Sequence, residues 1–183
     1  MRTISLAEEL KHYDSQYEAE ELFRRKFLTL LQHERAFQRD HLPGHITGST
    51  WIVDEELEHV LLTHHAKLLK WLQPGGHADG DADVRRVAMR EAEEETGITT
   101  FTILQKSIFD IDIHPIPARK DFPAHDHYDI RFLVQASRKE PLIITEESND
   151  LQWIPMHDIE KATAGNMSIL RMLEKTRRLK STR

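Results

Sequence analysis

The sequence predicts a mixed α/β (α+β) domain, residues 43–183, preceded by a helical N-terminal extension, residues 1–42. The chain has 183 residues, which is the length of one domain of ordinary size. Apolar residues recur at helical spacing up to Pro43 and alternate like strands after it. The predicted order of helices, strands, helix, strands and helix is typical of a sheet covered by helices.

The amino-acid composition excludes several classes of protein. The chain contains no cysteine, so it has no disulfide framework, thiolate zinc site or cysteine nucleophile. Its apolar runs span a few residues, far below the roughly 18 that a bilayer span needs. The first residues also lack the apolar segment of a signal peptide. We therefore expect a soluble cytoplasmic protein without membrane contact, and the net charge of −6 argues against nucleic acid as a partner.

The helical extension is predicted from apolar spacing over residues 3–40. Asp14 or Ser15 is expected to cap a second helix there, and Pro43-Gly44 ends the helical segment. The apolar pattern comprises Leu6, Leu10, Tyr13, Phe23, Phe27 and Leu30 or Leu31. These helices either pack on their own domain or form the surface of a homodimer.

The main domain alternates strands with helices. Gly97 follows the first of these helices as an expected C-cap, and a proline-rich loop covers 114–123. Strands are predicted at 48–53, 60–63, 100–107, 109–113, 127–135 and 151–154, and helices at 83–96 and 166–180. Trp51, Trp71 and Trp153 lie at strand-like positions and are expected in the core, with stacking on a nucleobase as the alternative.

Twelve histidines are a high number for this length. His125, His127, Asp129 and Arg131 alternate along one predicted strand and so share one of its faces. That face is a polar wall of a substrate pocket, an additional metal site or a solvent-exposed strand surface, and the residues leave all three open.

Two further groups are candidates for binding substrate phosphates. His77 directly follows a glycine pair, where it can reach a bound phosphate. Arg119 and Lys120 lie in the proline-rich loop, which can bring positive charge to a substrate or remain solvated.

One segment, Gly76–Ile98, carries a far more specific pattern. Glu91, Glu94 and Glu95 are spaced i, i+3 and i+4, which places them on one face of a helix. Three adjacent carboxylates repel one another, and a hard divalent cation such as Mg²⁺ or Mn²⁺ removes that penalty. The segment holds seven acids and three arginines, a net charge of −4 out of −6.

The neighbours of these glutamates fit the same interpretation. Arg90 lies four residues before Glu94, at ion-pair spacing, where it can orient that carboxylate. Gly75-Gly76 leaves a bare backbone whose carbonyl can approach a metal or a phosphate. An apolar stripe of Val84, Val87 and Ala88 is expected to hold the helix against the sheet.

The segment resembles the Nudix box, with the pattern G-x5-E-x7-R-E-U-x-E-E-x-G-U, where U is a bulky aliphatic residue. The matching residues are Gly76, Arg90, Glu91, Glu94, Glu95, Gly97 and Ile98, with the small Ala92 at the first U. The first Glu of the pattern is replaced by Ala82, which has no ligand atom. Asp81 and Asp83 flank that position and are candidates to compensate.

The resemblance implies a Nudix-like α/β/α sandwich with a mixed sheet, and metal-dependent hydrolysis of a diphosphate linked to another moiety. It implies Glu91, Glu94 and Glu95 as ligands of Mg²⁺ or Mn²⁺, with the Gly76 carbonyl as a further ligand and Arg90 as the residue that orients the glutamates. The general base is a glutamate of the box or of a later loop, where Glu146 and Glu147 are candidates.

The resemblance leaves the substrate open, and a nucleoside diphosphate derivative is the expected one. Because Ala82 departs from the pattern, a non-catalytic nucleotide-binding or regulatory module on the same fold is the alternative. Isoprenoid diphosphate isomerases share the fold that the resemblance implies, but they use a catalytic cysteine, which this chain lacks.

Overall fold

The computed structural model describes residues 4–146 and 148–182. The chain divides into two compact units. Unit 1 comprises 1–49, 75–88 and 106–132, and unit 2 comprises 50–74, 89–105 and 133–183. The first 42 residues thus belong to the same compact unit as parts of the predicted main domain.

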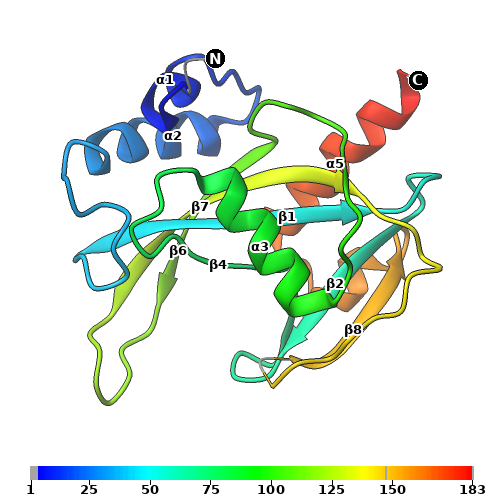
Figure 1. The fold of residues 1–183 in the computed structure, drawn as a ribbon. Coiled ribbons are helices and arrows are strands. Elements are labelled where there is room, and N and C mark those ends of the chain that lie inside the picture. Colours follow the sequence, from blue (N-terminus) through cyan, green and yellow to red (C-terminus); the bar gives the residue numbers. More distant parts are fainter. Residues whose placement is uncertain (1–3, 147, 183) are drawn as a thin grey trace. The chain divides into compact units, whose positions relative to one another are not determined.

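Two helices precede the first strand: α1, Leu6–Lys11, and α2, Glu18–Leu30 (Figure 1). The predicted helical segment ends at Leu30, and turns continue from there almost to Pro43. Tyr17 is the N-cap residue of α2 and makes no side-chain capping hydrogen bond, so the predicted capping by Asp14 or Ser15 is wrong.

Instead, Ser15 and Tyr13 bind a buried carboxylate on α2. The hydroxyl of Tyr13 donates to Glu20 at 2.7 Å, and Ser15 donates to the other carboxylate oxygen. Glu20 also accepts the backbone N–H of Ile111 at 3.2 Å, and it is fully buried. The side chain of Glu20 therefore ties the helical extension to a strand of the main domain.

The strands of unit 1 pair in two antiparallel sets. β4, Gly75–His77, pairs with β1, Gly44–Val53, so that Gly76 faces Gly48. β6, Asp110–Ile116, pairs with β7, His125–Gln135, over seven residue pairs. β6 extends into the predicted proline-rich loop as far as Ile116, which shortens the loop to the turn between β6 and β7 (Figure 1). β1 and β7 each continue into unit 2.

The core of unit 1 lies on one face of these strands. Ile46 of β1, Ile111 of β6 and Ile130 of β7 are buried there. The helical extension contributes Leu6, Leu10, Phe27 and Leu30 to the same cluster, and the third helix contributes Val84, Val87 and Ala88. The extension therefore packs on its own domain, which is one of the two arrangements predicted from the sequence.

Close backbone approach explains two glycines of unit 1. A Cβ on Gly48 would lie 2.8 Å from the carbonyl oxygen of Val84. A Cβ on Gly75 would collide with the side chain of Ser49 on the paired strand. Larger residues at these positions would push β4 and the start of the helix away from β1.

Unit 2 contains the remaining strands. β2, His59–His65, pairs antiparallel with β3, Lys70–Leu72, and with β8, Ser148–Pro155. β5, Thr102–Ile103, is far shorter than the strand predicted at 100–107 and pairs with the end of β7. In the unit 2 part of β1, Ile52 faces Leu61 of β2.

Three helical segments complete the chain. α3, Val84–Thr96, coincides with the predicted helix, and Gly97 follows it with φ +75°, as expected for a glycine C-cap. α5, Met167–Ser181, begins at the N-cap Asn166 and also matches its prediction. α4, Ile159–Ala162, was not predicted because one helical turn leaves no periodic pattern.

The fold class is the predicted one, an α+β chain with a mixed sheet and helices. Among the described residues, every helix is too short or too polar to cross a bilayer.

Candidate active site

The carboxylates of the motif lie on the second half of α3, in unit 2. Val84, Val87 and Ala88 are buried on the preceding turns of α3, as predicted. Ala92 extends this apolar stripe, and its side chain is fully buried. Glu91, Glu94 and Glu95 are left on a different side of the helix, where Glu91 is 14% and Glu94 59% exposed. The helix therefore presents three oxygen-bearing side chains at successive positions of one face.

Arg90 binds two of these carboxylates. Its Nη2 lies 2.8 Å from Oε1 of Glu91, and its Nη1 donates to Oε2 of Glu94 at 3.1 Å. The Arg90–Glu94 pair expected from the spacing is present. Although partial burial opposes it, the charges of Glu91 and Glu94 raise the pKa of the Arg90 guanidinium. Arg90 thus remains a cation and holds two of the three glutamates in fixed orientations.

The donor set of α3 fits a hard divalent cation. Glu91, Glu94 and Glu95 offer carboxylate oxygens only, which Mg²⁺ and Mn²⁺ prefer over nitrogen or sulfur. Gly76 lies in β4 of unit 1, opposite Gly48, with a backbone carbonyl and no side chain. Its proposed part as a ligand stays a prediction.

The residues around Ala82 already have structural partners. Ala82 is exposed. Asp81 accepts hydrogen bonds from the Arg86 guanidinium at 2.8 and 2.6 Å, and from the backbone N–H of Asp83. Asp83 accepts the backbone N–H of Arg86 at 3.1 Å, which caps the start of α3. Both acids therefore stabilise the helix start, and the missing glutamate is not replaced by an unengaged carboxylate here.

Unit 1 contains a second concentration of polar side chains, on the face of its strands opposite the apolar core. We call it the polar face. Its residues come from β1, β4, β6 and β7 and are His45, Thr47, Ser49, His77, Asp110, Asp112, His114, His127, Asp129 and Arg131. The strand registers place them together, since Thr47 faces His77, Asp110 faces Arg131 and His114 faces His127. The predicted solvent-exposed strand surface is wrong, because most of this face is buried.

Asp129 and Arg131 form the centre of a buried ionic network. Arg131 Nε donates to Asp129 at 2.8 Å, and its Nη1 and Nη2 donate to Asp110 at 3.1 Å and Asp112 at 3.2 Å. Ser49 and Thr47 donate to the two oxygens of Asp129 at 2.7 and 3.0 Å.

The network contains more acidic than basic side chains, with three aspartates around one arginine. Burial alone would lower the pKa of Arg131, but the charges of Asp112, Asp129 and Asp110 raise it far above the usual range. One guanidinium therefore faces three carboxylates, and the polar face carries excess negative charge. Asp129 and Arg131 act together as interior residues, and their predicted contact with substrate stays a prediction.

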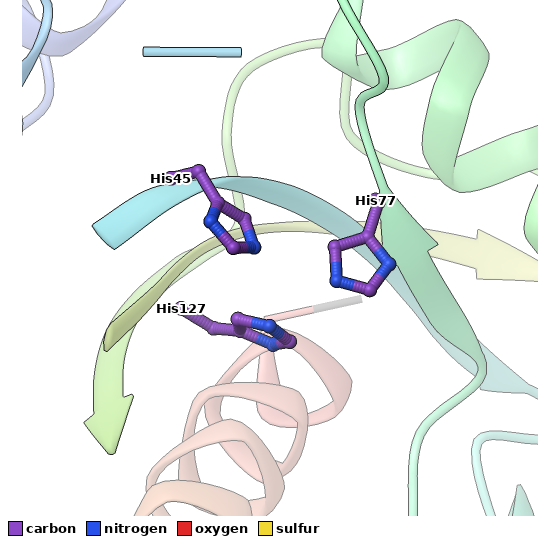
Figure 2. Close-up of side chains that lie close together, drawn as sticks. All are labelled: His45, His77 and His127. Carbon is purple, nitrogen blue, oxygen red and sulfur yellow. The ribbon is translucent and has the colours of Figure 1, made fainter. Parts of the chain in front are cut away.

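The imidazoles of the polar face gather beside this network. Figure 2 shows His45, His77 and His127 converging from three separate strands. Their ring centroids lie 5.0 to 5.2 Å apart. Burial and the neighbouring imidazoles lower the pKa of His127 to about 2, and burial and Arg39 lower the pKa of His77 to about 4. Burial also lowers the pKa of His45. His77 and His127 are therefore neutral at physiological pH.

The remaining predicted residues, where the structure describes them, lie at exposed positions in turns. Arg119 and Lys120 are exposed, and the backbone N–H of Arg119 donates to the carbonyl of Phe122 within the β6–β7 turn. Glu146 is exposed. Glu147 lies outside the described residues.

The three tryptophans occupy different environments within unit 2. Trp51 is fully buried, as expected, and its indole N–H donates to Thr176 at 2.9 Å. Trp71 and Trp153 line an open pocket of about 380 Å³ together with Asp158 and Lys161. Trp153 also packs against the buried cluster of Ile52, Leu61, Ala92 and Ile98, as expected for a core tryptophan.

Sequence reasoning missed six members of the polar face: His45, Thr47, Ser49, Asp110, Asp112 and His114. A signal was present in β1, where polar residues at 45, 47 and 49 alternate with Ile46 and Gly48. Asp110 and Asp112 alternate with Ile111 in the same way. Only the pairing of the strands shows that these residues face Arg131.

Comparison with known proteins identifies the family. A family model described as the NUDIX domain matches residues 43–175, most of the chain. The chain belongs to the NUDIX family. Its Nudix box is the segment 76–98, and Nudix hydrolases act on pyrophosphate bonds and generally require divalent cations. No curated protein matches the chain significantly by sequence.

Solved structures agree with this fold. An Ap4A hydrolase from C. elegans, in a binary complex, is 18% identical over 75% of this chain and 98% of its own, with a TM-score of 0.61. The MutT protein from Methanosarcina mazei Go1 is 20% identical over 74% and 94%, with a TM-score of 0.59. A NUDIX family hydrolase from Clostridium perfringens is 23% identical over 74% and 97%, with a TM-score of 0.57.

Proposed function

We propose that this Nudix protein is a metal-dependent hydrolase of the diphosphate linkage in a nucleoside diphosphate joined to another moiety. The observation that carries the proposal is the set of three carboxylates on one face of α3, two of them held by Arg90. Residues 43–183 form the hydrolase domain in this proposal, and residues 1–42 are an extension that completes its core.

Each residue of the site has a separate task in this proposal. Glu91, Glu94 and Glu95 hold the cation, and the Gly76 carbonyl is a further ligand. A bound Mg²⁺ or Mn²⁺ neutralises diphosphate charge and lowers the pKa of an attacking water. Arg90 orients Glu91 and Glu94, so that their oxygens need little rearrangement when the cation enters. The proton of the attacking water passes to a box glutamate or to a later acid, for which Glu146 and Glu147 are the candidates.

A nucleotide derivative is the substrate class we favour. The neighbours of similar fold include an Ap4A hydrolase from C. elegans and a dihydroneopterin triphosphate pyrophosphohydrolase from E. coli. The pocket lined by Trp71 and Trp153 supports this class, because its indole rings can stack on a nucleobase. Arg119 in the β6–β7 turn, His77, His127, Asp129 and Arg131 stay proposed substrate contacts.

A hydrolysis screen tests the proposal. The purified protein is incubated with nucleoside triphosphates, dinucleoside polyphosphates, nucleotide sugars and non-nucleotide diphosphates, with Mg²⁺, with Mn²⁺ and with chelator alone. We expect cleavage of at least one nucleotide derivative with either metal and none with chelator. Tight nucleotide binding without hydrolysis under every condition would instead establish the non-catalytic alternative, to which Ala82 points.

A further inference from the structure

The three central imidazoles of the polar face have the geometry of a metal-binding site. Among the described residues, one group of three or more His, Asp or Glu side chains brings its ligand atoms within 4.8 Å of one another, and it consists of His45, His77 and His127. The three come from β1, β4 and β7, and their rings point toward a common centre (Figure 2).

Two of these rings have a buried nitrogen without a partner. Nε2 of His45 and Nε2 of His127 are inaccessible to solvent and make no hydrogen bond. His45 as a whole is 1% exposed. A buried polar atom without a partner costs about 1–3 kcal/mol, so in folded proteins such an atom is usually satisfied by a bound water, ion or other ligand.

The backbone orients His45 for such a ligand. Its Nδ1 lies 3.3 Å from the carbonyl oxygen of His41. An N–H at Nδ1 donates to that carbonyl, which leaves the lone pair at Nε2 directed toward the other two rings. Metal-bound histidines usually have this arrangement, in which the second ring nitrogen donates to a backbone carbonyl or a carboxylate.

We propose that His45, His77 and His127 form a binding site for a transition-metal cation, Zn²⁺ in the first instance. Imidazole nitrogen suits Zn²⁺, whereas Mg²⁺ and Ca²⁺ prefer oxygen ligands. Three histidines with an open fourth position are an established zinc coordination set. The site uses different residues and a different class of donor from the carboxylates of α3.

Small side-chain movements are enough to bind the ion. Zn–N bonds of 2.0–2.1 Å in a tetrahedron hold ligand nitrogens about 3.3 Å apart. The nitrogens of this group are at most 4.8 Å apart, so each pair has to close by about 1.5 Å or less. Rotation of the imidazole rings supplies movements of this size without displacing the strands.

The surroundings favour a cation at this position. His114 links the cluster to the ionic network, since its ring is 5.5 Å from that of His127 and its Nδ1 is 3.3 Å from Asp112. The network holds three aspartates and one arginine, whereas Asp79 near His77 is paired with Arg39 and adds little negative potential there. Bound Zn²⁺ offsets this excess charge and connects three strands of unit 1.

The test measures zinc binding to the full-length protein without a histidine tag. Metal is removed with chelator, and Zn²⁺ is titrated by calorimetry in saturating Mg²⁺ on a Glu94→Gln background, which weakens competition from α3. We expect one tightly bound Zn²⁺ per chain and a higher melting temperature in its presence, because a ligand that binds only the folded state stabilises it. Co²⁺ in place of Zn²⁺ is expected to give the visible absorption of a tetrahedral nitrogen site.

Variants assign the binding to these residues. His77→Asn and His127→Gln are each expected to weaken Zn²⁺ binding more than about 10-fold. Loss of a residue that only orients a metal ligand already weakens metal binding by about 10- to 100-fold, and loss of a ligand should cost at least as much. The matched control is His157→Asn, since His157 is 81% exposed and outside the cluster. Circular dichroism of the metal-free variants verifies folding, and two different positions keep the test valid if one variant unfolds. Unchanged zinc affinity in both folded variants, or no zinc bound by the parent protein, would overturn the proposal without affecting the hydrolase assignment.

Discussion

Two clusters of ionisable residues in this protein are built on opposite plans. The carboxylates of α3 belong to one helix and one short stretch of sequence, and Glu94 is 59% exposed. The polar face of unit 1 collects its residues from four strands, and Arg131 at its centre is 3% exposed. The first cluster contains oxygen donors, whereas the second contains imidazoles beside an internal ion network.

The difference in burial indicates whether each cluster contributes mainly to chemistry or mainly to stability. A solvated carboxylate keeps most of its hydration in the folded state, so changing it affects chemistry more than stability. A buried charge has lost its hydration and depends on its partners, so removing a partner destabilises the fold. We therefore expect substitutions on α3 to reduce turnover and substitutions in the ionic network to reduce stability.

The largest effect is expected from Arg131→Met. The substitution leaves Asp110, Asp112 and Asp129 buried without their common cation, which costs about 3–5 kcal/mol of unfolding free energy. Urea denaturation followed by circular dichroism measures this loss. The control is Arg86→Met, where an exposed pair with Asp81 is worth about 0–1 kcal/mol. Equal losses in the two variants would remove the distinction between the clusters.

Glu94→Gln tests the other side of the comparison. The variant keeps the shape of the side chain but removes the carboxylate charge that we propose binds the cation. Turnover should therefore fall more than about 100-fold, which exceeds the effect of losing a residue that only orients metal ligands. Its unfolding free energy should change by less than about 0.5 kcal/mol, as at other exposed positions. Steady-state kinetics and urea denaturation give both values. Glu93→Gln, on an exposed position of the same helix, is expected to retain activity, and wild-type turnover in Glu94→Gln would refute the assignment.

Arg90→Lys sharpens the comparison within α3 itself. Lysine keeps the positive charge but cannot bind Glu91 and Glu94 at once as the guanidinium does. Activity is expected to fall about 10- to 100-fold, with the loss partly restored by higher Mg²⁺ or Mn²⁺ concentration. A metal titration of the initial rate checks this. A loss that no metal concentration changes would indicate a role for Arg90 other than orienting the ligands.

The smallest effect is expected from Thr176→Val, which removes a buried but neutral hydrogen bond. Trp51 donates to this hydroxyl at 2.9 Å, and leaving the indole N–H buried without a partner should cost about 1–3 kcal/mol. Thermal and urea unfolding measure it. A cost as large as that of Arg131→Met would mean that burial alone, and not buried charge, governs the stability of the polar interior.

Sequence patterns predicted the long elements and the carboxylates of α3 because both depend on local spacing. The helix over 83–96 and the strand over 127–135 have apolar residues at one clear period, and the structure confirms them as α3 and β7. The capping of α2 by Asp14 or Ser15 was wrong because Ser15 binds Glu20 instead. The short β4 and α4 lack enough residues to show a period.

The sequence by itself determined the family, the acidic face of α3 and the pairing of Arg90 with Glu94, because these depend on residues within one short stretch, 76–98. Only the tertiary structure decided that His45, His77 and His127 meet, and that Arg131 lies among three aspartates. Their positions depend on strand register, and a shift of one residue would turn each of these side chains to the opposite face. No local pattern specifies register between segments as far apart in the sequence as β1 and β7.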